Sequence, residues 1–234
     1  MALTESTMVN LGSKAPYFNL PNIDGKDLSI EDFTNEVLVV IFTCNHCPYA
    51  MAVEDRIIEL ANNYSSNVDF VLISSNDADN YPADSPEKMA EQAKNKNYPF
   101  PYLFDETQDI AKSYNAVCTP DIFLYDADRK LKYRGRLDDN WKEPEDVTRE
   151  ELKMTIDATL SGNEIEFMQI PSMGCNIKWK NYSLSNIFLV CLIVSPAEIK
   201  ASPVESTMSP TLSVTPSALS TAFFAKSLDM SETF

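Results

Sequence analysis

The chain has 234 residues, and its 35 acidic side chains outnumber its 19 basic ones, which gives a formal net charge of −16. A charge of this sign repels phosphate backbones and anionic membrane surfaces, so we expect neither nucleic acid nor a membrane as a partner. The five cysteines lack the dense, regular spacing of a small secreted domain, which favours a reducing compartment and catalytic thiols.

The two ends of the chain carry no targeting signal that we recognise. Residues 1–7 contain neither the basic nor the apolar region of a secretory signal peptide. The longest apolar run near the C-terminus, Ile187–Val194, is much shorter than the roughly 20 residues of a membrane-spanning helix. We therefore expect a cytoplasmic protein.

The first third of the chain predicts a hairpin, a buried strand and a long helix. Turn-forming residues in 15–33 indicate a β-hairpin that turns at Asp24-Gly25, and Ser29–Phe33 then predicts a short helical turn. The continuous apolar run Val37–Phe42 is typical of a strand buried on both faces. Apolar residues at helical spacing predict a helix from about Pro48 to Tyr64.

Strands and helices alternate in the rest of the chain up to residue 160. We expect a strand over Val68–Ser74, a helix over Pro86–Lys96 with Ser85 as its N-cap, a short strand over Tyr102–Phe104, a short helix over Gln108–Tyr114, strands over Asp121–Tyr125 and Lys130–Arg136, and a helix over Thr148–Leu160 that ends at Gly162. Strand, helix, strand, helix predicts a parallel β-α-β unit. The fold class is therefore α/β, with a central mixed sheet flanked by helices and an N-terminal hairpin extension.

The composition changes beyond Lys180 to serine, threonine, proline and alanine with few charges. Such a segment has little reason to pack against a domain. We therefore predict one domain over residues 9–180 and a low-complexity, disordered C-terminal tail over residues 181–234.

A pair of cysteines stands where the strand Val37–Phe42 gives way to the following helix. Cys44 and Cys47 are separated only by Asn45 and His46. The start of a helix favours a thiolate over a thiol, because unpaired backbone N–H groups point at it. At this spacing two thiols serve dithiol exchange, with Cys44 as the exposed sulfur that attacks a disulfide and Cys47 as the sulfur that resolves the mixed disulfide.

His46 is the chain's single histidine. A protonated imidazole beside the thiolate would lower the pKa of Cys44 and make the disulfide more oxidising. The alternatives are half of a structural zinc site or two cysteines of the core. Zinc needs four ligands, and the sequence has no second pair at this spacing. We therefore expect no metal and no bound cofactor.

Residues Val37–Leu137 resemble the thioredoxin fold, with Cys44-Asn45-His46-Cys47 as its active-site motif and Thr119-Pro120 as its cis-proline. The resemblance implies that the cis-proline loop packs against the cysteine pair and that the backbone before the proline binds the substrate peptide. Thr119 and Pro120 are therefore candidate substrate-binding residues. Tyr49, beside the motif, is expected to form a wall of the active-site groove.

Two further segments resemble the redoxin, or AhpC/TSA-type, branch of the thioredoxin-like superfamily. Residues 12–26 are similar to the N-terminal hairpin of peroxiredoxin-like redoxins. Residues 171–179 resemble the closing segment of uncharacterised redoxin-type proteins that also carry Asn-His-Cys-Pro-Tyr. The resemblance spans residues 9–180.

The chain departs from two related patterns. Thioredoxins have a buried aspartate where this chain has Leu38, so we expect no buried carboxylate that could deprotonate Cys47. Peroxiredoxins bind peroxide with P-x-x-x-T-x-x-C. Aligning Cys47 with the peroxidatic cysteine places Cys44 at the threonine and Val40 at the proline, which disfavours peroxide reduction.

The leading hypothesis is therefore a thiol-disulfide oxidoreductase that exchanges disulfides with protein or small thiol substrates and is recharged by a reductase. The second hypothesis is a peroxiredoxin-like thiol peroxidase with antioxidant activity and Cys47 as its peroxidatic cysteine. The third is a binding domain whose thiols sense the redox state of the cell.

Two more cysteines are candidate auxiliary thiols. Cys118 lies two residues before the proline and is either such a thiol or a small buried side chain. Cys175 follows Gly174 in a segment expected to be an exposed loop, and either resolves a disulfide with Cys47 or Cys118 or has a packing role. Asp121 is expected to end a strand rather than to titrate.

Overall fold

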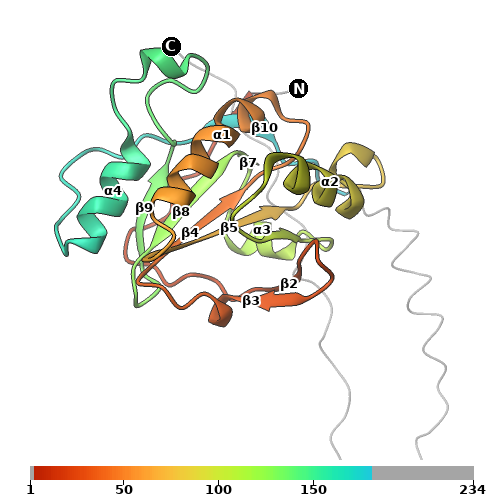
Figure 1. Cartoon of the computed structure of the whole chain (residues 1–234), viewed down its shortest axis with the longest axis horizontal. Coiled ribbons are helices and arrows are strands. Elements are labelled where there is room, and N and C mark those ends of the chain that lie inside the picture. Colours follow the sequence, from red (N-terminus) through yellow and green to blue (C-terminus); the bar gives the residue numbers. More distant parts are fainter. Residues whose placement is uncertain (1–2, 181–234) are drawn as a thin grey trace, which may run out of the picture. The chain divides into compact units, whose positions relative to one another are not determined.

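The computed structural model describes residues 3–180, and a five-stranded mixed sheet forms its centre (Figure 1). The strand order is β6-β5-β4-β8-β9. The strands are β4 (Val37–Phe42), β5 (Val68–Ser74), β6 (Tyr102–Phe104), β8 (Asp121–Tyr125) and β9 (Leu131–Gly135). β4, β5 and β6 are parallel, whereas β8 and β9 are antiparallel. The predicted β-α-β unit and the mixed sheet are confirmed.

The central strand β4 is buried on both faces, as its unbroken apolar run predicts. Successive side chains of a strand point to opposite faces. Val37, Val39 and Ile41 accordingly pack in one core cluster, and alternate residues such as Leu38 and Val40 pack in the other. The sheet therefore separates two apolar layers.

Four helices supply the outer walls of these layers. They are α1 (Pro48–Asn63), α2 (Pro86–Lys96), α3 (Asp109–Ser113) and α4 (Glu151–Leu160). Ile57 of α1 and Ile156 of α4 pack in the first cluster, and Ala111 of α3 packs in the second. These helices confirm the prediction of a sheet flanked by helices on both sides.

The starts of helices α2 and α4 test the prediction of helix boundaries from the sequence. The Ser85 hydroxyl accepts a hydrogen bond from Lys88 N at 3.4 Å, as expected of an N-cap before Pro86. Helix α4, in contrast, begins at Glu151 rather than at the predicted Thr148. The Thr148 amide donates a hydrogen bond to the Asp139 carboxylate at 2.9 Å, so Thr148 belongs to the loop that precedes the helix.

The predicted N-terminal hairpin is formed by β2 (Asn19–Pro21) and β3 (Asp27–Ser29). Its turn contains Gly25 with φ +82°, a conformation that favours glycine. The helical turn η1 (Ile30–Asp32) follows, with Ser29 and Asp32 forming a capping box. Both predictions for this segment are confirmed.

A second, three-stranded sheet was not predicted. It consists of β1 (Leu3–Glu5), β10 (Met173–Asn176) and β7 (Cys118–Thr119) in the order β1-β10-β7. The segment around Cys175, expected to be an exposed loop, is therefore a buried strand in which Cys175 is only 2% exposed. Such short, polar strands lack the alternating apolar pattern from which a strand is recognised.

Gly174 allows β10 to lie directly on the cis-proline loop. A Cβ atom at this position would lie 2.0 Å from the Thr119 carbonyl oxygen, a backbone atom that a side-chain rotation cannot move away. We expect Gly174→Ala to lower the free energy of unfolding by about 1–3 kcal/mol, as overpacking does. Urea denaturation measures this, with Met173→Ala at the neighbouring, more exposed position as the control; equal effects of the two variants would contradict the contact.

The predicted tail, residues 181–234, lies outside the described residues, so its disorder remains a prediction. β1 begins before the expected domain start at residue 9. Within residues 3–180, no helix combines the length and the apolarity required to cross a membrane.

Candidate active site around the cysteine pair

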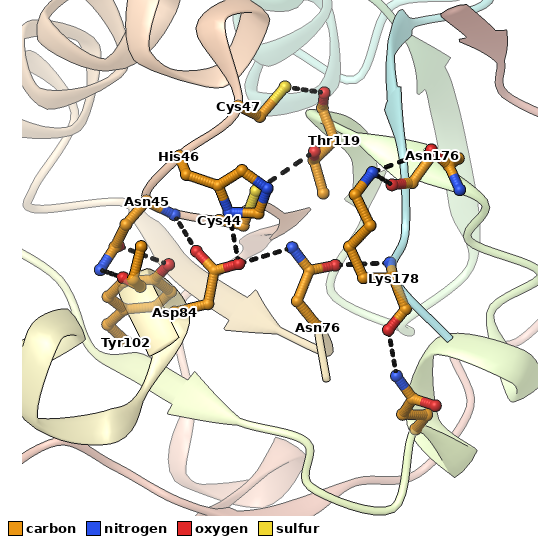
Figure 2. Close-up of polar contacts among 12 residues, drawn as sticks. Cys44, Asn45, His46, Cys47, Asn76, Asp84, Tyr102, Thr119, Asn176 and Lys178 are labelled. Atoms are coloured by element: carbon orange, nitrogen blue, oxygen red, sulfur yellow. Dashed lines mark hydrogen bonds and ion pairs between the residues drawn. The ribbon is translucent and has the colours of Figure 1, made fainter. Parts of the chain in front are cut away.

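The cysteine pair lies in the loop between β4 and α1, and Cys47 is the N-cap residue of α1 (Figure 2). The loop continues the sheet by one hydrogen bond, from Thr43 N to Ile73 O at 2.9 Å. Cys44 is 4% exposed and Cys47 is fully buried. The prediction of an exposed Cys44 is therefore wrong, because its side chain packs with Cys47 and Cys175 and contacts Thr119.

The predicted cis-proline is confirmed, because the Thr119-Pro120 peptide bond is cis. Both cysteines contact the residue before it. Cys44 Sγ lies 3.6 Å from Thr119 Oγ1, and Cys47 Sγ lies 3.1 Å from the Thr119 carbonyl oxygen, to which it donates when protonated. The loop thus packs against the pair as the resemblance to thioredoxins implies.

The backbone of Thr119 is already paired within the chain. Thr119 is opposite Cys175 in the antiparallel register of β7 and β10. A peptide that paired with this edge would have to displace β10. Substrate binding by Thr119 and Pro120 therefore remains a prediction, and this strand limits how an extended peptide can approach.

A buried carboxylate lies beside Asn45 and His46 of the motif, at a place that the comparison with Leu38 did not indicate. It is Asp84, at the end of the turn η2 (Pro82–Asp84), and it is fully buried. Asp84 accepts hydrogen bonds from Asn45 N and Asn76 Nδ2, each at 2.8 Å. The carboxylate comes from a turn after β5, so no residue near the motif signalled it.

His46 faces this carboxylate. Its Nδ1 lies 2.6 Å from Asp84 Oδ2, although the two are not aligned as a good hydrogen bond, and its ring stacks on Tyr81 with centroids 5.6 Å apart. Figure 2 shows the imidazole between the motif and Asp84. A charge on His46 would therefore be partly balanced by Asp84 before it could act on a thiolate.

The pKa values of the two thiols move in opposite directions. A hydrogen bond from Cys44 lowers the pKa of Cys47 against the effect of burial, with help from Cys175, Thr119 and the Ala50 amide at the helix start. The same hydrogen bond, burial and the Asp84 charge raise the pKa of Cys44. This reverses the predicted order, because the hydrogen bond between the two thiols favours the thiolate of Cys47 and the protonated form of Cys44.

Asp84→Asn should make Cys44 more reactive at a given pH. The aspartate charge raises the pKa of Cys44, so removing it lowers that pKa and enlarges the thiolate fraction. We expect roughly tenfold faster alkylation of Cys44 near neutral pH, the effect of about one unit of pKa. Iodoacetamide labelling resolved by peptide mass spectrometry measures it, with the nearby buried Asp77→Asn as the control. An unchanged or slower rate would contradict the electrostatic role of Asp84.

A small cavity opens beside Cys44. Its volume is about 10 Å³, and its lining includes Cys44, Asn45 and Met51 but not Cys47. This volume holds about one water molecule, so the site must open to admit a larger substrate. Tyr49, the predicted groove wall, packs against the cysteine cluster and on Trp141, with ring centroids 4.3 Å apart.

The two candidate auxiliary thiols lie in different surroundings. Cys118 is fully buried, and its Sγ lies 3.7 Å from the Pro120 carbonyl oxygen. Burial raises its pKa, which suits a small packed side chain. Cys175 packs in one cluster with Cys44 and Cys47 and is a hydrogen-bond partner of Cys47.

Further hydrogen bonds connect Lys178, which follows β10, to the site (Figure 2). Lys178 N donates to Asn76 Oδ1 at 2.8 Å, and Asn76 in turn donates to Asp84. The Lys178 carbonyl accepts from Gln108 Nε2 at 2.8 Å. These contacts fix Asp84 through residues that the sequence analysis did not single out.

Three of the site's side chains form a candidate metal-binding group. One ligand atom each of Cys44, His46 and Asp84 lies within 4.8 Å of the others. Structural zinc takes four ligands, and within residues 3–180 no further cysteine, histidine or acidic residue joins them at that distance. The contacts of Asp84 with Asn45 and Asn76 already explain its position. The absence of a metal or cofactor remains a prediction.

Comparisons with known proteins identify the family and the fold of the chain. Residues 11–134, more than half of the chain, match the model of the AhpC/TSA family. The solved structure of an uncharacterized conserved protein from Geobacillus kaustophilus is 46% identical, with a TM-score of 0.74, and the match covers 78% of this chain and 99% of that one. A Mycobacterium tuberculosis protein whose name assigns it provisionally to the peroxiredoxins is 29% identical over 115 residues, 49% of this chain and 69% of that protein.

The structure of a protein from Neisseria meningitidis, provisionally described as a thioredoxin, is 22% identical with a TM-score of 0.50, over 63% of this chain and 89% of that one. At this identity the likeness concerns the fold alone. It agrees with the predicted mixed sheet, the helix that follows the cysteines and the cis-proline loop. The chain therefore has a thioredoxin-like fold and belongs to the AhpC/TSA family.

Proposed function

We propose that the protein is a thiol-disulfide oxidoreductase in which Cys44 and Cys47 alternate between dithiol and disulfide. The observation that carries the proposal is that the two thiols pack in one cluster and that both contact Thr119, the residue before the cis-proline. Dithiol exchange requires a second thiol within reach of the first, so that it can resolve the mixed disulfide. Protein or small disulfides would be the substrates, and a separate reductase would recharge the pair.

The exchange begins with a proton shift within the pair. In the resting reduced pair the proton is on Cys44 and Cys47 is the thiolate, because the pKa of Cys47 is lowered and that of Cys44 is raised. Transfer of that proton to Cys47 makes Cys44, the sulfur beside the cavity, the nucleophile. Cys44 then attacks one sulfur of the substrate disulfide. A bond forms between Cys44 and that sulfur, and the other substrate sulfur leaves and takes a proton from water.

The second step resolves the mixed disulfide. Cys47 gives its proton to the departing substrate sulfur and attacks Cys44 Sγ. The internal Cys44–Cys47 disulfide forms, and the substrate has been reduced to two thiols by the two electrons of the protein. Burial of Cys47 suits this role, since a resolving sulfur needs access only to Cys44.

A thiol peroxidase is the second candidate, and two observations favour it. The pKa of Cys47 is lowered, as a peroxide-reactive thiol requires, and the Mycobacterium tuberculosis relative carries a peroxiredoxin name. Against it, Cys44 stands where peroxiredoxins have their threonine, and Cys47 is fully buried. We therefore rank disulfide exchange first.

Parallel assays of insulin reduction with dithiothreitol and of hydrogen peroxide consumption separate the two candidates. We expect insulin reduction that depends on both cysteines and peroxide turnover near the rate of a free thiol. Rapid peroxide consumption that survives Cys44→Ser, together with no insulin reduction, would instead identify Cys47 as a peroxidatic cysteine and contradict the proposal.

A further inference from the structure

A third thiol lies against the inner side of the cysteine pair. Cys175 comes from β10, far along the chain from the motif, and it is 2% exposed. It packs in one cluster with Cys44, Cys47 and Ala50. The mechanism proposed above does not use it. A buried thiol packed against a redox-active sulfur is chemically significant, because exchange requires that one sulfur have access to the other.

The strand register explains why Cys175, and not Cys118, faces the pair. Cys175 stands directly opposite Thr119, whereas Asn176 stands opposite Cys118. Directly opposed residues of an antiparallel pair share one face of the sheet, and neighbours along a strand alternate between faces. Cys175 is therefore on the face of Thr119, whose side-chain oxygen lies 3.6 Å from Cys44 Sγ.

Cys47 consequently lies between two thiol partners. It packs in one cluster with Cys44, from its own loop, and with Cys175, from β10. Cys118 is directed elsewhere, because its sulfur contacts the Pro120 carbonyl oxygen at 3.7 Å. Gly174 packs directly on the Thr119 carbonyl group and so fixes the position of β10. Cys175 therefore belongs to a fixed strand rather than to a loop.

We propose that Cys175 is a third redox thiol, which attacks Cys47 in the Cys44–Cys47 disulfide and moves that disulfide to Cys47–Cys175. This step rests on the proposed function, which supplies the first disulfide. The bond between Cys47 and Cys175 forms as the bond between Cys44 and Cys47 breaks, and the proton of Cys175 passes to Cys44. One thiol and one disulfide yield one thiol and one disulfide, so no external oxidant or reductant takes part.

The rearrangement has a functional consequence. It returns Cys44, the sulfur beside the cavity, to the thiol state while the oxidised bond is retained in the interior. Cys44 can recover that bond by attacking Cys47 again. The pair would then have two disulfide forms, of which only the Cys44–Cys47 form places an oxidised sulfur beside the cavity.

Peptide mapping of the full chain tests the proposal. The reduced protein is oxidised with a limiting amount of oxidised glutathione, quenched with acid, alkylated and digested without reduction. We expect one peptide with an internal Cys44–Cys47 disulfide and one pair of peptides joined by a Cys47–Cys175 disulfide. Cys175→Ser should lose the second disulfide and keep the first, and Cys118→Ser, the matched buried-thiol control, should keep both. Cys44→Ser oxidised with diamide should yield Cys47–Cys175 alone.

The outcomes separate this proposal from the proposed function. If the Cys44–Cys47 pair forms but Cys47–Cys175 is absent from both the unmodified protein and Cys44→Ser, the third-thiol proposal is wrong and disulfide exchange by the first pair stands. Absence of the Cys44–Cys47 disulfide from Cys175→Ser, in which it cannot move to Cys175, contradicts the proposed function instead. A disulfide that joins Cys175 to Cys118 or Cys191 instead of Cys47 would also overturn the assignment. The unmodified protein is sufficient to detect this outcome, so it does not depend on the folding of any variant.

Discussion

Cys44→Ser should reduce the rate of insulin reduction by at least about a thousandfold, because a serine hydroxyl cannot replace a thiolate as the attacking group. Cys44 is the member of the pair that borders the cavity, whereas Cys47 is fully buried behind it. The rate is followed by the turbidity of the precipitating insulin chains with dithiothreitol as reductant.

Cys47→Ser should fail at a different step. Cys44 can still attack the substrate, but no neighbouring sulfur resolves the product, so a mixed disulfide on Cys44 should accumulate and be visible by mass. Cys118→Ser is the control and should retain nearly the full rate, since the sulfur of Cys118 contacts the Pro120 carbonyl oxygen and not the cysteine pair. Undiminished insulin reduction by Cys44→Ser would show that the nucleophile is misassigned.

Asp121→Ala should lower the free energy of unfolding by about 3–5 kcal/mol, the usual result of leaving one partner of a buried ion pair alone. Asp121 and Arg134 are both fully buried. Arg134 donates to the two carboxylate oxygens from Nε at 3.3 Å and Nη2 at 2.8 Å, and its guanidinium carbon lies 4.4 Å from the centroid of the Phe123 ring. Removing the aspartate leaves the buried Arg134 cation without its ion-pair partner.

Urea denaturation at about pH 7.5 measures the effect. Burial raises the pKa of Asp121 to about 6, so the carboxylate is ionised under these conditions. The double variant Asp121→Ala with Arg134→Leu should recover much of the loss, because it leaves no charge behind. The exposed pair Lys88–Glu91 is the matched control, and Glu91→Ala should change the free energy of unfolding very little, because water screens an exposed ion pair. A loss of that small size for Asp121→Ala would contradict the buried pair.

The sheet and the core of the site follow from local signals in the sequence. The unbroken apolar run of β4 predicted a strand buried on both faces, and the residues after it predicted a helix that begins at Pro48. The Thr119-Pro120 bond is cis as the resemblance implied. These features depend on residues close together in the chain, or on a motif with a definite place in the fold.

The features that were missed depend on residues brought together only by folding. Asp84 reaches Asn45 and His46 from a turn after β5, and nothing in the motif signals a carboxylate there. Strand β10 is too short and too polar to show a strand pattern, yet it buries Cys175 against Cys47. The predicted order of the thiol pKa values was reversed mainly by the hydrogen bond between the two thiols, and Asp84 and Cys175, which folding brings to the pair, act in the same direction.

The most direct test of the account is a single turnover of the fully reduced protein with an excess of a small disulfide substrate, followed by acid quenching and peptide mapping. Disulfide exchange predicts that two protein thiols disappear for each substrate disulfide reduced and that the Cys44–Cys47 pair is the first internal disulfide to form. Substrate reduction with Cys44 and Cys47 still recovered as free thiols would contradict the account.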